Sequence, residues 1–306
     1  MISVGVDIGG TKALAVRLDG SQIVERSRFT VERVTETMDA VMASIDSVHD
    51  EAVQTIGVGV AGLVLPSDGT LVWGPHVPGT NLDIATAVSE RFEVPVYVDN
   101  DANTAAFAEL KLGAANGYDD VLFVTLGTGI GGAVVIGGSL YRGGGFAGEW
   151  GHMQVDRDGH LCDCGKRGCW ETRASGPALV RLARQVVTRN PDSALARMLN
   201  QESISGESVV AAADAGDETA RALVTEVGRS FGQGLAGLVA IFDPELIVIG
   251  GGLGSVGESI IGPARRVLTD SLHGGRLRVP PAVQVATLGP TAGAVGAALL
   301  AAEMAV

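Results

Sequence analysis

The feature that most constrains this fold is a strand, glycine turn, strand pattern that occurs twice in distant parts of the chain. In the first copy, the β-branched run Ile2–Val6 leads into Asp7 and IGGT, and strand-like residues resume at Ala13–Leu18. The second copy is VLFVTLGTGIGGAVVIGG, Val121–Gly138. The repeat predicts two related α/β lobes, each presenting a glycine turn to a common cleft.

Apolar spacing predicts an alternation of strands and helices through the rest of the chain. The expected order is a helix over 36–53, a strand within 55–64, a strand, polar turn and helix within 95–115, helices between 178 and 242, a strand at 246–252 and a final helix at 291–306. From the repeated pattern we place an N-terminal α/β lobe at 1–115 and a larger α/β lobe, which includes the cysteine cluster, at 116–290. The helix at 291–306 is expected to pack back on the first lobe.

Composition and charge exclude several classes of protein. Of 306 residues, 46% are hydrophobic and 19% are charged, which is typical of a globular protein, and the net charge of -13 argues against a nucleic-acid or anionic lipid partner. The N-terminus lacks the basic and apolar segments of a signal peptide. The apolar tail Thr291–Val306 is too short for a membrane span and is interrupted by Glu303. We therefore expect a cytoplasmic protein with no membrane partner.

All three cysteines lie in the segment GHMQVDRDGHLCDCGKRGCWE. Cys162, Cys164 and Cys169 form C-x-C-x4-C, and Gly165 and Gly168 would let the chain fold back until the three sulfurs converge. Clustered thiols in a cytoplasmic protein favour metal binding over a disulfide. The segment therefore predicts a metal site.

Such a site needs a fourth ligand, and spacing alone leaves the choice between His152 and His160 open. Either imidazole could instead be solvated or packed in the core. A Cys3His set would be a closed, structural zinc site. If zinc orders this loop, the flanking carboxylates of Glu149 and Glu171 could accept hydrogen bonds from sugar hydroxyls, although surface exposure is the commoner state of a glutamate.

Three glycine turns could bind a nucleotide. In DIGGTK, Asp7–Lys12, the glycines would bring backbone N–H groups against phosphate oxygens and Asp7 could hold a Mg²⁺-bound water, while a plain β-turn is the alternative. LGTGIGG, Leu126–Gly132, would hold the phosphates from the second lobe. IGGGLG, Ile249–Gly254, would let an adenine ring approach the backbone.

The segment VDNDAN, Val98–Asn103, joins a predicted strand to a predicted helix. Asp101 could accept a proton from a substrate hydroxyl during phosphoryl transfer. An Asp or Asn in this position is more usually a helix N-cap, and the residues alone leave both interpretations open.

Together and in this order, these motifs resemble the ROK family of sugar kinases and sugar-responsive repressors over nearly the whole chain. DIGGTK is similar to the first phosphate motif of the family, VDNDAN to the segment with its catalytic aspartate, and LGTGIGG to its second phosphate motif. EWGH is similar to the sugar motif E-x-G-H, and CDCGKRGCWE to the zinc signature C-x-C-G-x-x-G-C-x-E. The resemblance implies the two-lobe actin-like ATPase (ribonuclease H-like) α/β architecture, with ATP and sugar in an interlobe cleft, and a homodimer.

The resemblance also implies roles for individual residues. Asp101 would be the general base. The sugar ligands would be Asn100, Glu149, His152 and Glu171. The zinc ligands would be His152, Cys162, Cys164 and Cys169. The phosphate contacts would be Asp7, Gly9, Gly10, Thr11, Lys12, Gly127, Thr128, Gly129 and Gly131. From the glycine pattern itself, we add Gly251 and Gly252 as nucleotide contacts. Where family glucokinases have Pro-Asn, this chain reads Gly74-Pro75-His76, so His76 and the nearby Asn81 are further candidates for sugar contact.

The expected activity is ATP-dependent phosphorylation of a hexose, with glucose to glucose 6-phosphate as the first choice, ATP and Mg²⁺ as cofactors and Zn²⁺ as a structural ion. The alternatives within the kinases are fructose, mannose or an N-acetylhexosamine as substrate. The alternative from another class is a sugar-sensing regulator. Because the first predicted strand begins at Ile2, we expect no DNA-binding domain before it.

Overall fold

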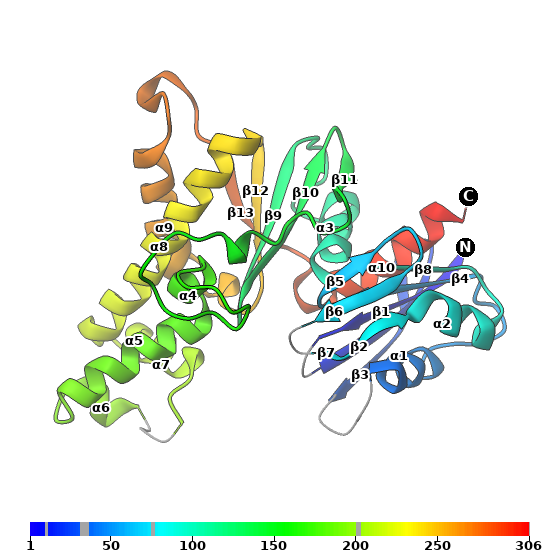
Figure 1. Cartoon of the computed structure of the whole chain (residues 1–306), viewed down its shortest axis with the longest axis horizontal. Coiled ribbons are helices and arrows are strands. Elements are labelled where there is room, and N and C mark those ends of the chain that lie inside the picture. Colours follow the sequence, from blue (N-terminus) through cyan, green and yellow to red (C-terminus); the bar gives the residue numbers. More distant parts are fainter. Residues whose placement is uncertain (10–11, 31–36, 75–76, 200–202, 306) are drawn as a thin grey trace. The chain divides into compact units, whose positions relative to one another are not determined.

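The computed structural model describes residues 1–9, 12–30, 37–74, 77–199 and 203–305. It consists of two compact units (Figure 1). Unit 1 is Met1–Asp119, Gly132–Gly148 and Ala286–Val306, and unit 2 is Asp120–Gly131 and Glu149–Val285. Of the predicted site residues, Gly10, Thr11 and His76 lie outside the described part of the chain, as does the side chain of Lys12.

Unit 1 is built on a five-stranded sheet with the order β3-β2-β1-β4-β8. Its strands are β1 (Ile2–Ile8), β2 (Lys12–Asp19), β3 (Gln22–Thr30), β4 (Thr55–Val60) and β8 (Val96–Asn100). β1, β4 and β8 run parallel, so their carboxyl ends lie at one edge of the sheet. β1 therefore delivers Asp7, and β8 delivers Asn100 and Asp101, to the same edge.

Helices cover both faces of this sheet (Figure 1). α1 (Thr37–Asp46) and α2 (Ile84–Phe92) pack into one apolar core, and α3 (Asp101–Leu112) and α10 (Ala292–Met304) into another. Gly5 and Gly57 let α10 approach the strands, because a Cβ atom at either position would lie 1.9 Å from a carbonyl oxygen of α10. The Ala/Gly-rich tail thus forms a packed helix. Among the described residues, no helix combines the length and apolarity that a membrane crossing needs.

Unit 1 also contains a small antiparallel sheet and a hairpin. The small sheet has the order β5-β6-β7 and consists of β5 (Leu63–Leu65), β6 (Thr70–Gly74) and β7 (Val77–Asp83). The hairpin pairs β10 (Ile130–Ile136), which begins in unit 2, with β11 (Ser139–Tyr141).

Glu109 in α3 connects this helix to the segment before α10. Its buried carboxylate accepts hydrogen bonds from Leu288 N and Thr287 Oγ1.

Unit 2 combines parallel strands with helices. β12 (Leu246–Gly250) pairs in parallel with both β9 (Val121–Leu126) and β13 (Ala282–Val285). Its helices are α4 (Glu171–Ala174), α5 (Gly176–Arg189), α6 (Ala194–Met198), α7 (Gly206–Asp214), α8 (Glu218–Phe242) and α9 (Glu258–Ser271). Short 3-10 helices are η2 (Trp150–His152), η3 (Gly254–Val256) and η4 (Gly275–Leu277) here, and η5 (Gly289–Thr291) in unit 1. α8 packs closely on α9, because a Cβ atom at Gly232 would lie 2.3 Å from Ala264 O.

Two element predictions need correction. The helix expected over 36–53 ends at Asp46, where turn and coil begin. The polar turn expected between β8 and α3 is absent, because Asn100 ends the strand and caps the helix directly.

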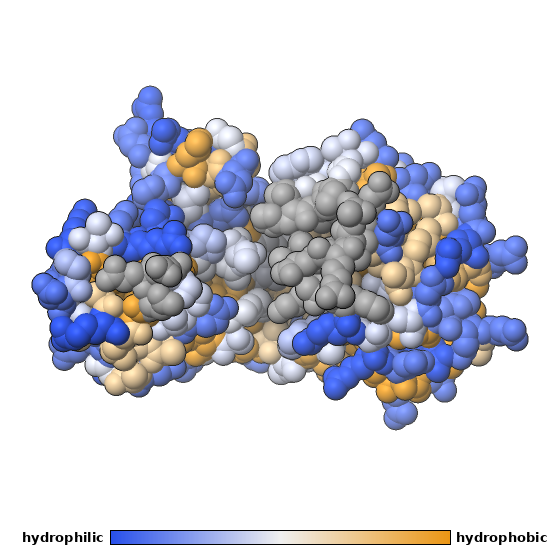
Figure 2. Space-filling model, turned by 90° about the horizontal axis from the view of Figure 1, so that it is seen from below, coloured by the Kyte–Doolittle hydropathy of each residue, from blue (hydrophilic) through white to orange (hydrophobic). Residues whose placement is uncertain are grey.

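The surface seen in Figure 2 is mostly hydrophilic, with hydrophobic residues in small separate patches, as is usual for a globular protein.

Candidate active site and metal centre

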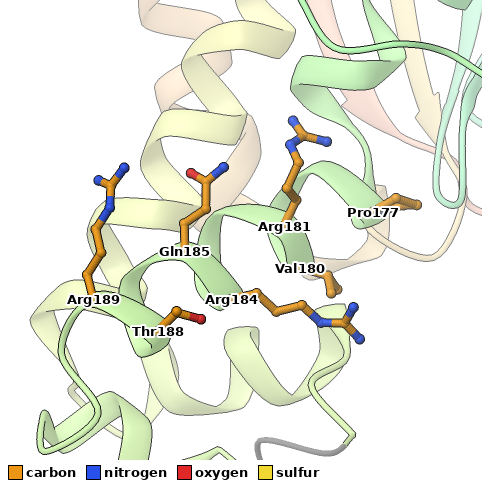
Figure 3. Close-up of a pocket in the computed structure, with 7 residues that line it drawn as sticks. All are labelled: Pro177, Val180, Arg181, Arg184, Gln185, Thr188 and Arg189. Carbon is orange, nitrogen blue, oxygen red and sulfur yellow. The ribbon is translucent and has the colours of Figure 1, made fainter.

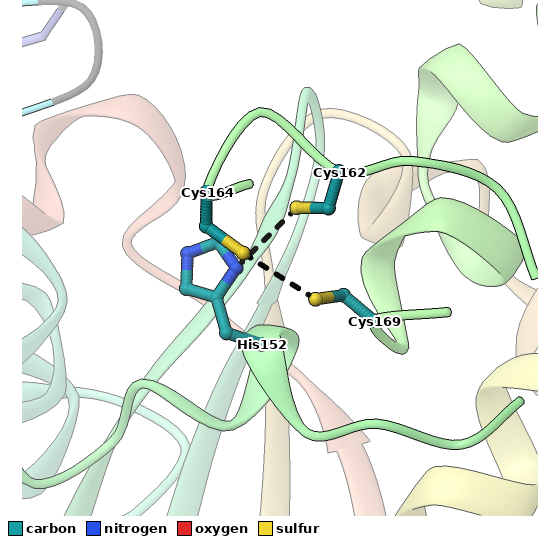
Figure 4. Close-up of side chains that lie close together, drawn as sticks. All are labelled: His152, Cys162, Cys164 and Cys169. Atoms are coloured by element: carbon teal, nitrogen blue, oxygen red, sulfur yellow. Dashed lines mark hydrogen bonds between the residues drawn. The ribbon is translucent and has the colours of Figure 1, made fainter. Parts of the chain in front are cut away.

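Four side chains of unit 2 converge as a metal ion would require (Figure 4). The ligand atoms of His152, Cys162, Cys164 and Cys169 all lie within 4.8 Å of one another. Cys164 Sγ is 3.5 Å from Cys169 Sγ, and Cys162 Sγ is 3.6 Å from His152 Nδ1. Tetrahedral zinc, with bonds of about 2.3 Å to sulfur and about 2.0 Å to nitrogen, needs ligand separations of about 3.5 to 3.8 Å. The donor set and its spacing therefore fit a structural zinc ion bound through Nδ1.

Backbone hydrogen bonds and two glycines shape the cysteine loop. Cys162 N donates to Lys166 O at 2.8 Å, and Gly168 N donates to His160 O at 2.8 Å. Gly165 and Gly168 have φ of 85° and 71°, a conformation that favours glycine. The loop brings His152, and not His160, to the three sulfurs. His160 is exposed and lines a separate cavity of about 330 Å³ behind the loop.

Two acids flank the metal cluster. Glu171, the first residue of α4, has Oε1 2.9 Å from Cys162 Sγ and 3.4 Å from His152 Nδ1. Glu149, just before η2, has Oε2 4.0 Å from His152 Nε2. Burial and the hydrogen bond to Glu171 raise the pKa of the Cys162 thiol. Both carboxylates and the free ring nitrogen of His152 are thus gathered around one loop.

The second glycine turn lies directly beside this group. A Cβ atom at Gly129 would come within 2.7 Å of Glu171 Oε2. Gly127 O accepts a hydrogen bond from Gly176 N, at the N-terminus of α5, at 2.8 Å. The turn after β12 joins them, because Gly251 has φ of 85° and a Cβ atom there would lie 2.5 Å from Leu126 O. Two glycine turns and a helix N-terminus therefore meet where parallel strands end, an arrangement suited to anionic ligands.

In unit 1, Asn100 and Asp101 divide the two roles that the sequence left open. Asn100 is the N-cap of α3: its Oδ1 accepts from Ala102 N at 2.8 Å and from Asn103 N at 3.3 Å, and its Nδ2 donates to Gly62 O at 3.0 Å. Asp101 is the first helical residue, and Ala102 N also donates to its Oδ1. Burial raises the pKa of Asp101. The capping role therefore belongs to Asn100, and Asp101 is left as a half-buried carboxyl group with a raised pKa.

Asp7 lies at the same edge of the sheet. Burial, together with the negative charge of Asp101, raises its pKa from 3.8 to about 7. α10 presses against it, because a Cβ atom at Gly293 would lie 2.6 Å from the Asp7 carboxyl group. The two carboxyl groups thus disfavour each other's ionisation, and a cation nearby would favour it.

Asn81 is a further predicted site residue. Asn81, in β7, is exposed and has a left-handed φ of 52°. Sequence reasoning missed Asp99 and Arg142, which form an ion pair in which Asp99 is buried and Arg142 is partly exposed. The signal available in the sequence was an acidic residue near the end of an apolar strand. A groove of about 510 Å³ along α5, lined by residues such as Arg181 and Arg184 (Figure 3), contains none of the predicted site residues.

Comparison with known proteins places this site in a family. The sequence model described as the ROK family matches residues 3–304. The chain belongs to the ROK family. A relative, a glucokinase from Streptomyces coelicolor, is 37% identical over 310 residues that cover 99% of this chain and 98% of that protein.

Solved ROK structures share the fold over the full length. A ROK family glucokinase from Streptomyces griseus in complex with glucose and AMPPNP matches with a TM-score of 0.89 and 39% identity, covering 99% of this chain and 100% of that one. A ROK hexokinase from Thermus thermophilus matches with a TM-score of 0.79 and 32% identity, covering 100% and 99%. The predicted family and the predicted two-lobe actin-like ATPase fold are confirmed, and the His/Cys cluster is consistent with the zinc motif of the ROK family.

Proposed function

We propose that this ROK protein is an ATP-dependent hexose kinase that converts glucose to glucose 6-phosphate. The observation that carries the proposal is the close approach of Glu171 to the glycine turn at Gly129 and to the metal cluster, which sets a hydroxyl acceptor beside an anion-binding turn. The relatives support the choice of sugar, since the Streptomyces coelicolor protein is named a glucokinase and the Streptomyces griseus structure contains glucose and AMPPNP.

Sugar recognition would rest on Glu149, His152 and Glu171, with Asn100 as a further contact. The two carboxylates accept hydrogen bonds from neutral hydroxyls, and such charge-assisted bonds are strong and directional. His152 would hold the zinc ion through Nδ1 and leave Nε2 for the substrate. A zinc ion with four protein ligands has no open position, so it would supply rigidity to the loop and no chemistry of its own.

Phosphoryl transfer would rest on Asp101 and on the glycine turns. Asp101 would take the proton from the sugar hydroxyl as its oxygen attacks the terminal phosphate of the ATP–magnesium complex. Its raised pKa suits a base that must accept a proton near neutral pH. The backbone N–H groups of the turns at Gly127–Gly131 and Gly251 would hold the phosphates, and positioning of this kind supplies most of the catalysis in phosphoryl transfer.

A coupled assay that follows ADP release tests the proposal. The purified chain is incubated with ATP and Mg²⁺ and, separately, glucose, mannose, fructose, N-acetylglucosamine and N-acetylmannosamine, and the kcat/KM values are compared. We expect glucose to have the highest kcat/KM. A higher value for an N-acetylhexosamine would change the substrate, and glucose binding by calorimetry without ADP release from any sugar would favour a sugar-sensing protein over a kinase.

A further inference from the structure

A fully buried carboxylate lies two residues before Asp101. Asp99 in β8 is 0% exposed, and a buried charge is costly unless it is paired and hydrogen-bonded. Its Oδ2 accepts from Nε of Arg142 at 2.8 Å and from Tyr97 Oη at 3.2 Å, and a second nitrogen of Arg142 also lies at 2.8 Å. One oxygen of Asp99 is therefore held by Arg142 and Tyr97.

The other oxygen of Asp99 holds the segment that carries Asp101. Oδ1 accepts from the backbone N of Asn100 and from Nδ2 of Asn103, both at 2.8 Å. These two residues stand on either side of Asp101 along the first turn of α3. The orientation of the Asp99 carboxylate therefore fixes the backbone that presents Asp101.

Arg142 reaches this carboxylate from a different part of unit 1. It follows β11, and its carbonyl oxygen accepts hydrogen bonds from Gly145 N at 2.8 Å and from Ala147 N at 3.2 Å. Its guanidinium also lies 5.9 Å from the centre of the Tyr97 ring. The turn built on Arg142 ends at Gly148 and continues directly into Glu149. A single ion pair thus anchors both the Asp101 segment and the segment that leads to Glu149.

We propose that the Asp99–Arg142 ion pair is a positioning pair, which orients Asp101 for proton transfer and fixes the turn 143–148 of unit 1 without touching the substrate. The inference rests on the proposed kinase function. A purely structural role is the competing explanation, but an apolar pair of similar volume commonly serves stability as well as a buried ion pair does. Positioning explains why charges are used here, because only an ionised Asp99 can hold Arg142, Asn100 and Asn103 at once.

The test uses the full chain and the double variant Asp99→Asn/Arg142→Met, which leaves no unpaired charge in the interior. We expect it to fold, with kcat lower by about 10- to 100-fold and the KM for ATP unchanged, because a small misplacement of a reacting group costs about that much. The matched control is Arg17→Met. The Arg17 side chain is 21% exposed against 24% for Arg142, and it too belongs to unit 1 and pairs with acids, Glu25 and Asp50.

A rescue experiment separates positioning from stability. Guanidinium ion, added well below the concentrations that unfold the protein, should restore part of the kcat of Arg142→Ala. The same addition should leave the kcat of wild type and of Arg17→Met unchanged. Wild-type kcat in the double variant, or a loss no larger than its unfolded fraction measured by circular dichroism, would overturn the proposal. An inactive wild-type chain would show that the kinase function itself is wrong, and with it the positioning role.

Discussion

Asn100 and Asp101 are adjacent, but the structure gives them different tasks. Asn100 uses its side-chain oxygen to cap α3 and its amide to reach Gly62, while the Asp101 carboxyl group is half-buried and has a raised pKa. The start of α3 needs no acid at position 101 for capping, because Asn100 already caps the helix. Asp101 is therefore the residue at which the proposed chemistry is most directly tested.

Asp101→Asn should bind glucose with little change and lose turnover. Asn has nearly the same shape as Asp and can still accept a hydrogen bond from Ala102 N, but it cannot take a proton. We expect kcat to fall by about 10²- to 10⁴-fold, the range for removal of a general base. Steady-state kinetics and glucose titration by calorimetry measure the two effects.

The control for this substitution is Asp39→Asn, which changes an exposed acid in the first turn of α1 in the same unit. Its kcat should stay at the wild-type value. If Asp101→Asn also retains near-normal kcat, Asp101 is not the base.

At the scale of elements, prediction from sequence succeeded where the signal is local. β1 and β9 both lie where their β-branched runs predicted them, and β9 ends at the glycine turn that follows Leu126. α1 is shorter than its apolar spacing suggested, since its last packed residue is Ile45 and the chain then turns. The sequence did not predict that β5, β6 and β7 form one sheet, because hydrophobic periodicity does not show which strands pair.

The cysteine loop offers a prediction about one backbone position. A Cβ atom at Gly168 would lie 1.5 Å from Asp156 O, so Gly168→Ala should prevent the loop from closing. We expect the zinc content to fall well below the one ion per chain of a Cys3His site and the KM for glucose to rise, because Glu171 and His152 lose their support. Elemental analysis and the kinase assay measure the two quantities.

Gly165→Ala is the matched control for the loop. Gly165 also has a positive φ, 85°, but a Cβ atom there would meet nothing within 4 Å. Gly165→Ala should lower the free energy of unfolding by roughly 1 kcal/mol, which is the strain of an alanine in the left-handed conformation, and the variant should keep its zinc. Equal zinc content in the two variants would contradict the role given to Gly168.

At the scale of the whole molecule, the sequence predicted the family, the two-lobe fold and the residues that cluster with the three cysteines. It could not predict Asp99–Arg142, because the two residues are far apart in the chain and only the folding of unit 1 brings them together. The choice between His152 and His160 was likewise open on spacing alone. It depends on how the loop folds back, and in the folded loop His160 O accepts a hydrogen bond from Gly168 N.

The pH dependence of global stability should record the unusual state of Asp7. Its pKa is raised from 3.8 to about 7 on folding, so between these values the folded chain binds more protons than the unfolded chain. Stability must then fall as the pH rises through this window, by at most about 1.4 kcal/mol per pH unit from this group. Asp7→Asn removes that contribution. The free energy of unfolding of Asp7→Asn minus that of wild type should therefore increase from pH 4 to pH 7 and level off above it.

Urea denaturation at a series of pH values, without nucleotide or Mg²⁺, measures this difference. Asp39→Asn serves as the reference for exchanging an exposed acid in the same unit. The sign is diagnostic, because a carboxylate stabilised by a partner would give the opposite slope, with stability lost as the pH falls. A difference that declines from pH 4 to pH 7 would mean that Asp7 is held ionised in the folded chain. A rising difference would mean that burial, together with the charge of Asp101, disfavours the ionised form of Asp7 in the folded chain.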